Sequence, residues 1–146
     1  MNQGVRGLES MSFVFPQKIL FKHCDPAGIV FFPRYFEMIN DCVEAFFDDV
    51  LGLPFEDLHL NGGVPTAKIN TTFKAPSRHG DRIVLVLDCL AVGRSSLEIS
   101  IIASSQTDEV RFVSHSTLVF VDRAGKPTNW PEHAKEKLGK ILKGPR

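Results

Sequence analysis

The stretch PRYFEMINDCVEAFFDDVL, residues 33–51, has the apolar periodicity of one long amphipathic helix. Pro33 suits the first helical position because its fixed φ matches that of a helix. Gly52, just after the stretch, can take the left-handed conformation that ends a helix. Nineteen residues at about 1.5 Å each predict a helix about 28 Å long. The apolar stripe consists of Phe36, Ile39, Val43, Phe46 and Val50.

The segments on both sides of this helix have the patterns of β-strands. Residues 13–22 predict one strand before the helix, and Pro16 indicates an edge or a bulge because proline cannot donate a ladder hydrogen bond. After the helix, residues 64–75 alternate between apolar and polar side chains. The continuous apolar run at residues 82–92 predicts a strand covered on both faces. Two more strands are predicted at residues 97–104 and 110–122.

Short turns join the last four strands, so strands that follow one another are predicted to pair antiparallel. The order of elements predicts an α+β fold in which an antiparallel sheet of about five strands wraps around one long helix. The length suits a single domain over residues 1–146. It includes an N-terminal extension at residues 1–12, and a C-terminal helix opened by Pro131 with a basic tail at residues 131–146. The sheet has an open edge, which a second copy could cover.

The composition is that of a globular protein with no excess of either charge. The 146 residues include 17 Lys and Arg against 17 Asp and Glu, so nothing favours nucleic acid as a partner. Three cysteines without close spacing argue against a disulfide framework. No apolar run is long enough to span a membrane, and the N-terminus lacks the apolar segment of a signal peptide. We therefore expect a soluble cytoplasmic protein.

The segment between the first strand and the helix carries the candidate chemistry. Asp25 is followed by Pro26, Ala27 and Gly28, a stiff turn with small residues that let a ligand come close. Residues 29–32 are apolar and lead to the helix start, where free N–H groups can hold a developing oxyanion. These residues alone leave two interpretations open: a catalytic carboxylate, or an aspartate that only caps the turn.

A metal site and a cysteine nucleophile are both disfavoured in this segment. His23, Cys24 and Asp25 are consecutive, and adjacent residues of an extended chain point to opposite sides. No pair of ligands has a zinc-site spacing, so no metal is expected. Cys24 as a nucleophile needs a nearby base, and extended geometry turns His23 away from it. His115, within the last strand, is expected to be a hydrogen-bonded sheet histidine.

The run CDPAGIVFFPRYFEM, residues 24–38, resembles the defining segment of the 4-hydroxybenzoyl-CoA thioesterase family, a branch of the hotdog superfamily. The resemblance covers about residues 13–122. It implies a hotdog fold, and the order of elements predicted above independently is the hotdog order. Beyond the first run, the similar segments are GLPFEDL at 52–58, VPTAKINTTF at 64–73, and a turn with Pro76, Gly80 and Asp81.

This resemblance implies an acyl-CoA thioester hydrolase with Asp25 as its catalytic residue. In the family this aspartate attacks the thioester carbonyl or activates water, and both roles stay open. A backbone N–H at the start of the long helix polarises the carbonyl, and Phe32 holds that position here. Gly28 is then one of the substrate-binding residues. Because a thioester is electrophilic and its thiolate leaves well, no cofactor is expected beyond the substrate's own coenzyme A.

The resemblance also assigns both ends of the substrate. In the family, basic and hydroxyl side chains of one turn bind the nucleotide phosphates, which implies Arg94, Ser95 and Ser96 here. The longer basic run of the family is replaced by Val92 and Gly93, and a plain hairpin turn is the alternative for this segment. The acyl group, aromatic or short to medium, stays open, as does a carrier-protein thioester. The residues implied at the acyl pocket are Tyr35, Pro65 and Thr66. A packing role is the alternative for Tyr35, and a solvent-facing side chain is the alternative for Thr66.

Two other functions remain as alternatives. One is a hotdog hydratase or dehydratase, which uses a carboxylate together with a histidine. In the hydratases the histidine comes five residues after the aspartate, where this chain has Val30. A non-catalytic acyl-CoA binding protein is the other, since a fold does not fix a function. In the family, edges pair into one continuous sheet, which implies a homodimer as the minimum unit and a homotetramer, a dimer of dimers, as the commonest state. Each site would combine Asp25 of one chain with loops of the other.

Overall fold

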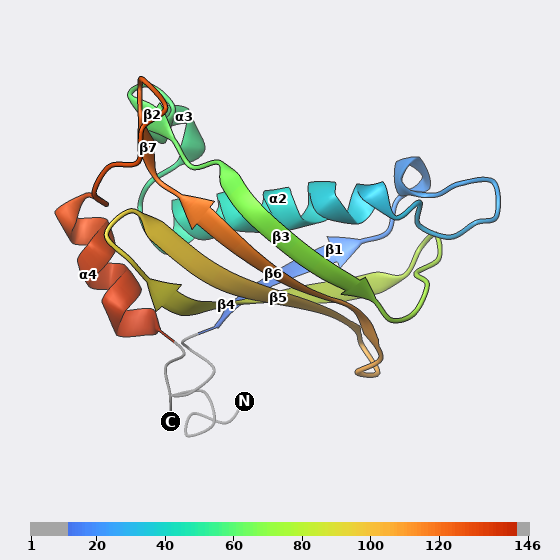
Figure 1. Cartoon of the computed structure of the whole chain (residues 1–146). Helices are drawn as coiled ribbons and strands as arrows, with labels where there is room; N and C mark the ends of the chain where they lie inside the picture. The colour runs from blue at the N-terminus through green and yellow to red at the C-terminus, as the bar shows by residue number, and fades with distance from the viewer. Residues whose placement is uncertain (1–11, 143–146) are drawn as a thin grey trace.

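The computed structural model describes residues 12–142, whose arrangement is shown in Figure 1. Of the predicted N-terminal extension only Ser12 is described, and the end of the basic tail, residues 143–146, also lies outside the described part. In chain order the elements are β1 (Phe13–Lys18), η1 (Phe21–His23), α2 (Pro33–Asp49), α3 (Phe55–Leu58), β2 (Gly62–Gly63), β3 (Thr66–Phe73), β4 (Arg82–Val92), β5 (Ser96–Ser105), β6 (Val110–Val119), β7 (Val121–Asp122) and α4 (Glu132–Ile141).

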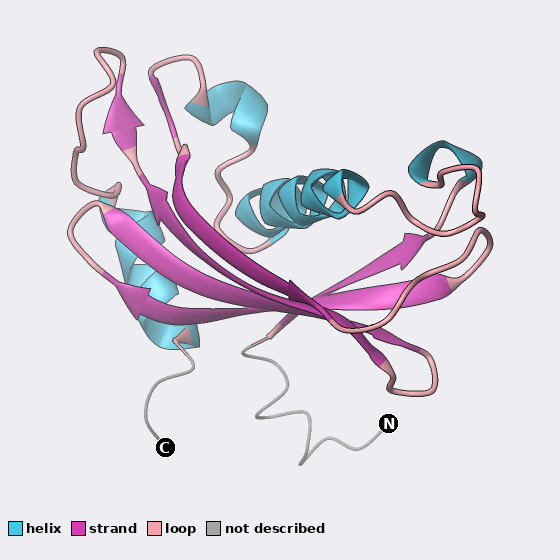
Figure 2. Ribbon diagram, turned by 45° about the vertical axis from the view of Figure 1, so that its right-hand side comes forward, coloured by secondary structure: helices cyan, strands magenta, loops and turns pink. Residues whose placement is uncertain are grey.

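Five strands form one antiparallel sheet in the order β1-β4-β5-β6-β3. The sheet curves around α2, which lies along its inner face (Figure 2). This confirms the predicted α+β architecture of one long helix wrapped by five antiparallel strands. Pro16 lies in β1, which is an edge strand of the sheet. Its missing N–H therefore removes no hydrogen bond between inner strands. The opposite edge is β3.

The core lies between α2 and the inner face of the sheet. The predicted apolar stripe is confirmed at its centre, whereas Phe36 and Val50 near its ends are only partly buried. The helix ends at Asp49 rather than at Leu51, and Gly52 has the left-handed φ of 65° that was predicted. Each large apolar side chain buried here contributes about 1.5–3 kcal/mol to stability. The buried side chains of α2 are Tyr35, Met38, Ile39, Cys42, Val43, Phe46 and Phe47.

Three of the predicted strands are shorter in the structure, and one of them, β3, spans Thr66–Phe73 rather than residues 64–75. β1 stops early because the Ile19 N–H donates to the carbonyl of Asp81, at 2.8 Å, and Phe21–His23 then form a short 3₁₀ helix. The last strand is interrupted at Phe120, whose N–H donates to the turn between β4 and β5 at 2.7 Å. Beyond it, β7 pairs with β2 in a separate two-stranded sheet, which the sequence pattern did not predict.

The prediction that β4 is covered on both faces holds only in part. Its inward side chains are fully buried, but Val84 and Val86 on the outer face are only partly buried. Beyond the first residue of β1, which pairs with Leu87, Leu142 after α4 pairs with Cys89. The C-terminal helix therefore covers the far end of β4 and leaves the remainder of its outer face more open.

The β4–β5 turn and the loop that precedes α2 lie at opposite ends of the sheet (Figure 1). β4 has 11 residues, which at about 3.3 Å per residue carry the chain roughly 36 Å. At the far end, Trp130 ties α4 to the turn: its backbone N–H donates to the Arg94 carbonyl and its indole N–H to the Ser96 carbonyl, each at 3.0 Å. This separation decides which predicted site residues can meet within one chain.

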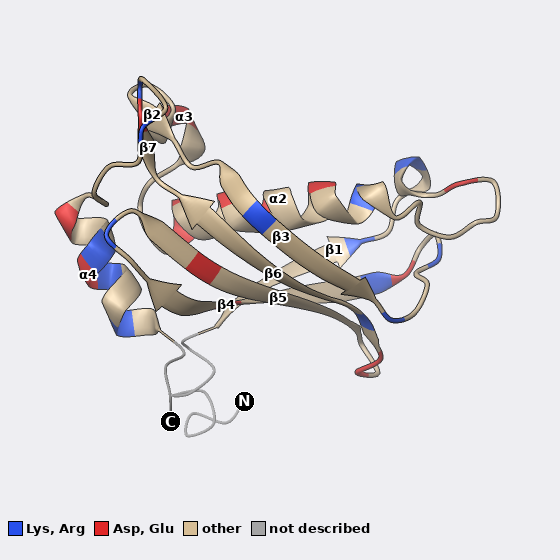
Figure 3. Cartoon of the chain, in the orientation of Figure 1, with Lys and Arg blue, Asp and Glu red and all other residues tan. Residues whose placement is uncertain are grey.

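Charged residues of both signs are spread along the described chain (Figure 3). The exposed side of α2 carries mostly acidic residues, whereas α4 is richer in lysine. None of the helices within residues 12–142 has the length and apolar character needed to cross a membrane.

Candidate active site

The residues between η1 and α2 form a small hairpin. The Phe31 N–H donates to the His23 carbonyl at 2.9 Å, and the Asp25 N–H donates to the Ile29 carbonyl at 3.0 Å. A bridge pair between these two rungs completes the ladder. Gly28, near the tip, has a φ of 81°, which glycine adopts without strain, and the space beside its Cα is open. The hairpin thus fixes Asp25 relative to the start of α2.

Asp25 is partly exposed, and one of its carboxylate oxygens accepts a hydrogen bond from the Ala27 N–H at 2.9 Å. This bond closes an Asx turn, so Asp25 does cap the turn as the simpler interpretation held. The other carboxylate oxygen receives no hydrogen bond from residues 12–142. Capping and catalysis therefore use different oxygens and do not exclude each other.

The first turn of α2 presents one backbone N–H group that has no acceptor within the described chain. Phe32 is the N-cap residue, with φ −51° and ψ −35°, and its side chain is 55% exposed. The N–H groups of Phe31, Arg34 and Tyr35 all donate to backbone carbonyls, and Pro33 has no N–H. For the Phe32 N–H, residues 12–142 supply no acceptor. Such a group at a helix start can stabilise an oxyanion.

Tyr35 both packs in the core and lines a cavity. Its ring stacks on Phe73, with centroids 5.8 Å apart, and its hydroxyl donates to Ser77 Oγ at 2.8 Å. Burial raises the pKa of this hydroxyl, so it stays protonated at neutral pH. A cavity of about 270 Å³ opens beside the hairpin, between Phe32, Tyr35 and Phe73. The predicted packing role and the predicted lining role therefore coexist.

A second apolar cavity, of about 280 Å³, lies between α2 and the edge strand β3. Thr66 lines it together with Phe36 and Ile69. Pro65, just before β3, is exposed and its carbonyl accepts the Val119 N–H at 3.0 Å. Of these two residues, Thr66 is the one that lines this cavity.

The predicted phosphate-binding residues lie at the far end of the sheet from Asp25 (Figure 1). Arg94 is exposed on a tight turn closed by the Gly93 N–H, which donates to the Ser96 carbonyl at 2.9 Å. A Cβ at Gly93 would meet the Ser96 hydroxyl, which would have to rotate away to make room for it. A single chain does not bring Arg94, Ser95 and Ser96 to Asp25.

The histidine and cysteines near the hairpin are poorly placed for nucleophilic chemistry. His23 is buried, its Nδ1 accepts the Leu20 N–H at 2.8 Å, and burial lowers its pKa, so the ring is neutral. Burial also raises the pKa of Cys42 and of Cys89 to about 12. Cys24 is only partly buried. In the part of the chain that the structure describes, no three metal-ligating side chains gather.

We expect a charged disulfide reagent to label Cys24 alone in the folded protein and all three cysteines after unfolding. The reason is that buried thiols with raised pKa values supply little thiolate. Cys24→Ser should keep kcat within about twofold, because a chain that does not use Cys24 as its nucleophile loses no reacting group. If Cys24 were the nucleophile, kcat would collapse, since a hydroxyl does not replace a thiolate. Mass spectrometry counts the labels, and ultraviolet absorbance follows turnover of the thioester substrate that the sequence resemblance leads us to expect. A folded Cys24→Ser protein without activity would reinstate the cysteine nucleophile.

Arg111 of β6 holds the loop behind the hairpin, and the sequence did not reveal this. Its side chain is 10% exposed, and its Nη1 donates to Asp81 at 2.9 Å and to the Ser77 hydroxyl at 3.0 Å. Its Nε lies 3.1 Å from a Glu109 carboxylate oxygen without hydrogen-bond geometry. The only hint of this role in the sequence was that Arg111 lies next to Phe112 within a predicted strand.

Asp81→Asn is expected to lower the unfolding temperature at neutral pH, and the deficit should shrink as the pH falls below about 4. A hydrogen bond from the Arg78 N–H and the contact with Arg111 hold the pKa of Asp81 below its ordinary value of 3.8. A depressed pKa stabilises the fold above that ordinary value, and the effect is lost as pH falls through the folded pKa. Thermal melts from pH 7 to pH 2.5 measure the deficit, with exposed Asp48→Asn as control. A deficit independent of pH would contradict the assignment.

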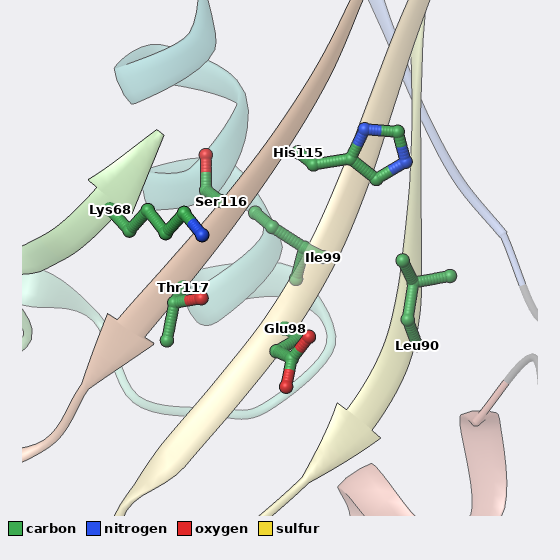
Figure 4. Close-up of a pocket in the computed structure, with 7 residues that line it drawn as sticks. All are labelled: Lys68, Leu90, Glu98, Ile99, His115, Ser116 and Thr117. Atoms are coloured by element: carbon green, nitrogen blue, oxygen red, sulfur yellow. The ribbon is translucent and has the colours of Figure 1, made fainter. Parts of the chain in front are cut away.

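The outer face of the sheet carries a small depression of about 120 Å³ on the side away from α2 (Figure 4). Lys68, Glu98 and His115 line it from three neighbouring strands. The His115 side chain is exposed, and no residue among 12–142 forms a hydrogen bond with its ring. The prediction of a hydrogen-bonded sheet histidine is therefore wrong for the side chain.

Residues 19–138 match the model of a family described as the thioesterase-like superfamily. The structure is similar to a 1,4-dihydroxy-2-naphthoyl-CoA thioesterase from Synechocystis, at 16% identity, with 88% of this chain and 96% of that chain covered and a TM-score of 0.81. It is also similar to a mutant 4-hydroxybenzoyl CoA thioesterase complexed with 4-hydroxybenzoyl CoA, at 22% identity, 88% and 99% coverage and a TM-score of 0.80.

A hypothetical protein from Staphylococcus aureus, solved in complex with CoA, is similar at 14% identity, with 92% of this chain and 87% of that chain covered and a TM-score of 0.85. No curated protein sequence matches the chain significantly. At these identities the likenesses establish the fold, and they confirm the predicted hotdog arrangement of the sheet around the helix.

Proposed function

Because this chain belongs to the thioesterase-like superfamily, we propose that it is an acyl-CoA thioesterase in which Asp25 is the catalytic carboxylate. One observation carries the proposal. A carboxylate with one oxygen free of hydrogen bonds from the described residues sits in a short hairpin that leads directly to the Phe32 N–H, which has no acceptor among residues 12–142. The Asp25 carboxylate can add to a carbonyl carbon or activate water, and the Phe32 N–H can hold the carbonyl oxygen.

The hairpin sets a suitable separation between these two groups. Asp25 lies opposite Ile29, three residues before Phe32, so roughly 10 Å of extended chain separates the backbones of Asp25 and Phe32. The proposal requires the free oxygen of the aspartate and the Phe32 N–H to face this interval. A thioester carbonyl placed there has its carbon toward the carboxylate and its oxygen toward the amide.

Hydrolysis then follows from ordinary acyl chemistry. Either Asp25 takes a proton from a water whose oxygen adds to the carbonyl carbon, or its carboxylate adds directly and water later cleaves the resulting anhydride. In both routes the carbonyl electrons move onto oxygen, where the Phe32 N–H stabilises them. The C–S bond breaks as the carbonyl re-forms, and the coenzyme A thiolate takes up a proton.

The two apolar cavities beside α2 are the candidate acyl sites. Tyr35 lines the one next to the hairpin and Thr66 the one along β3. Gly28 leaves open space at the hairpin tip through which the thioester can approach. Aromatic rings around Phe32 and Phe73, with centroids 5.6 Å apart, suit an aromatic or a short to medium aliphatic acyl group equally.

Arg94, Ser95 and Ser96 are proposed to bind the nucleotide phosphates of coenzyme A in a partner's site. Arg94 is exposed beside α4, which adds Lys135 and further lysines at the same end. The exposed side of α2, in contrast, is acidic and would repel phosphates. Since one chain separates Arg94 from its own Asp25 by the length of the sheet, a second chain is needed to complete the site.

Pairing of two chains through their β3 strands would complete the active site, and we therefore include a homodimer in the proposal. β3 pairs with β6 on one side, most of its residues are exposed, and the other edge strand contains Pro16. Antiparallel pairing of two β3 strands reverses one sheet relative to the other. The Arg94 end of one chain then lies at the same end as the Asp25 hairpin of its partner. A homotetramer of two such dimers is the expected common state.

The function is tested by following free thiol release from benzoyl-, phenylacetyl- and straight-chain acyl-CoA esters. Saturable release well above the uncatalysed rate supports the proposal, and the preferred ester identifies the acyl class. Hydration of an enoyl-CoA without thiol release would identify a lyase instead. Tight binding of the esters without any turnover would identify a non-catalytic acyl-CoA binding protein.

A further inference from the structure

The hairpin that carries Asp25 rests on the loop that joins β3 to β4. The Val30 N–H donates to the Ser77 carbonyl at 2.8 Å, and Ile29 forms a bridge with Arg78. The His79 N–H approaches the carbonyl of Gly28 at 3.4 Å. The second strand of the hairpin is therefore held in place by backbone contacts to three consecutive residues, beginning at Ser77.

The same serine also contacts the first turn of α2. Ser77 is fully buried, and its hydroxyl oxygen accepts the Tyr35 hydroxyl at 2.8 Å. Tyr35 lies three residues after Phe32, and its ring is fixed between Phe73 and Phe112, at 5.8 and 5.0 Å between centroids. Ser77 thus holds the hairpin through its carbonyl and the helix start through its hydroxyl.

Arg111 anchors this serine to the sheet. Its Nη1 donates to the Ser77 hydroxyl at 3.0 Å, to the Pro76 carbonyl at 3.2 Å and to Asp81 at 2.9 Å. A guanidinium that is 10% exposed and shared among three acceptors holds the loop in one conformation. The loop is thus fixed to β6, an inner strand of the sheet, and not only to the hairpin.

We propose that Ser77 is a positioning residue, which sets the distance between the Asp25 carboxylate and the Phe32 N–H without touching the substrate. This inference rests on the proposed thioesterase function. Both groups must lie about 3 Å from atoms of one carbonyl, and a displacement of about 1 Å in such geometry can cost up to a hundredfold in rate. Ser77 is the one buried residue with a hydrogen bond to each of the two elements that carry these groups, within residues 12–142.

Ser77→Ala is expected to lower kcat roughly tenfold and to change KM less than about twofold, since it loosens the geometry and removes no substrate contact. Tyr35→Phe removes the other partner of the same hydrogen bond. The double variant should therefore lose no more than the larger single loss, because one interaction cannot be lost twice. Additive losses would place Tyr35 and Ser77 in separate roles and overturn the shared positioning contact.

Ser114→Ala is the matched control. Ser114 is 1% exposed, and its hydroxyl bonds to Thr71 Oγ1 at 2.8 Å within the sheet, so the change also removes a buried hydroxyl bond. It should destabilise the fold to a similar degree and leave kcat within about twofold. If Ser114→Ala lowers kcat as much as Ser77→Ala does, the effect is general destabilisation and the positioning role is refuted.

Hydrogen–deuterium exchange gives a readout that does not depend on activity. Ser77→Ala should speed exchange at least roughly fivefold in the peptide covering residues 25–35, with the amides of β5 unchanged. Ser114→Ala should leave that peptide as in wild type. Unchanged exchange in Ser77→Ala would overturn the inference whatever the enzyme's activity. Normal turnover in Ser77→Ala beside an inactive Asp25→Asn would also overturn it, while leaving the proposed function intact.

Discussion

Asp25→Asn is expected to lower kcat for thioester hydrolysis by about a hundredfold or more in a protein that remains folded. Asparagine has nearly the same shape as aspartate, but it neither attacks a carbonyl nor accepts the proton of a water molecule. Its side-chain oxygen can still accept the Ala27 N–H, so the Asx turn survives. Thiol release under saturating substrate measures kcat, and circular dichroism with thermal melting measures the fold.

Asp122→Asn is the matched control, because Asp122 has the same local role at the other end of the molecule. One of its oxygens accepts the Ala124 N–H at 2.9 Å, as Asp25 does with Ala27. This variant should keep near wild-type turnover. If Asp25→Asn also turns over at a near wild-type rate, Asp25 only caps its turn and the catalytic assignment fails.

The fold could be predicted because its main determinants are local in sequence. Apolar residues at three- and four-residue steps identify α2, and two-residue alternation with tight turns identifies the strands. Both patterns are set by which face of each element the core covers. The small β2–β7 sheet could not be predicted in this way. The Phe120 N–H donates to the Ser95 carbonyl in the β4–β5 turn, and this contact between distant parts of the chain separates β7, which pairs with β2, from β6.

The candidate site was predictable only in part, for the same physical reason. Asp25, Gly28 and Phe32 lie within one hairpin and the helix start beside it, so a local motif contains them all. Ser77 and Arg111 reach that hairpin from two other segments, through contacts that no sequence spacing reveals. Their types are also uninformative, since serine in a turn and arginine in a strand are usually exposed to solvent.

Arg94→Ala is expected to raise KM for acyl-CoA by roughly 5- to 150-fold with little change in kcat, because loss of a charged phosphate contact costs about 1–3 kcal/mol. An acyl pantetheine thioester, which lacks the nucleotide, should be hydrolysed equally well by the wild-type and the Arg94→Ala proteins. Lys68→Ala, on the outer face of the sheet, removes a comparable exposed charge and should leave both values unchanged. Equal losses on the two substrates would place Arg94 outside the phosphate site.

Mixing the Asp25→Asn and Arg94→Ala proteins tests whether the two residues meet across a dimer. If one chain supplies Asp25 and its partner supplies Arg94, each mixed dimer has one site with both changes and one site with neither. With equal amounts and random exchange, half of the dimers are mixed, so about a quarter of all sites should regain full activity. The assay is made at low acyl-CoA, where the Arg94→Ala protein alone is nearly inactive.

Light scattering, and native mass spectrometry with one variant isotope-labelled, establish the dimer and the exchange of subunits. Recovery is expected because a single chain holds Arg94 and Asp25 at opposite ends of its sheet, whereas antiparallel pairing of β3 brings the two ends of different chains together. Exchange without recovery would mean that no site combines these residues from two chains. A monodisperse monomer with full activity would contradict the assembly itself, because the nucleotide would then have to bind without the partner's turn.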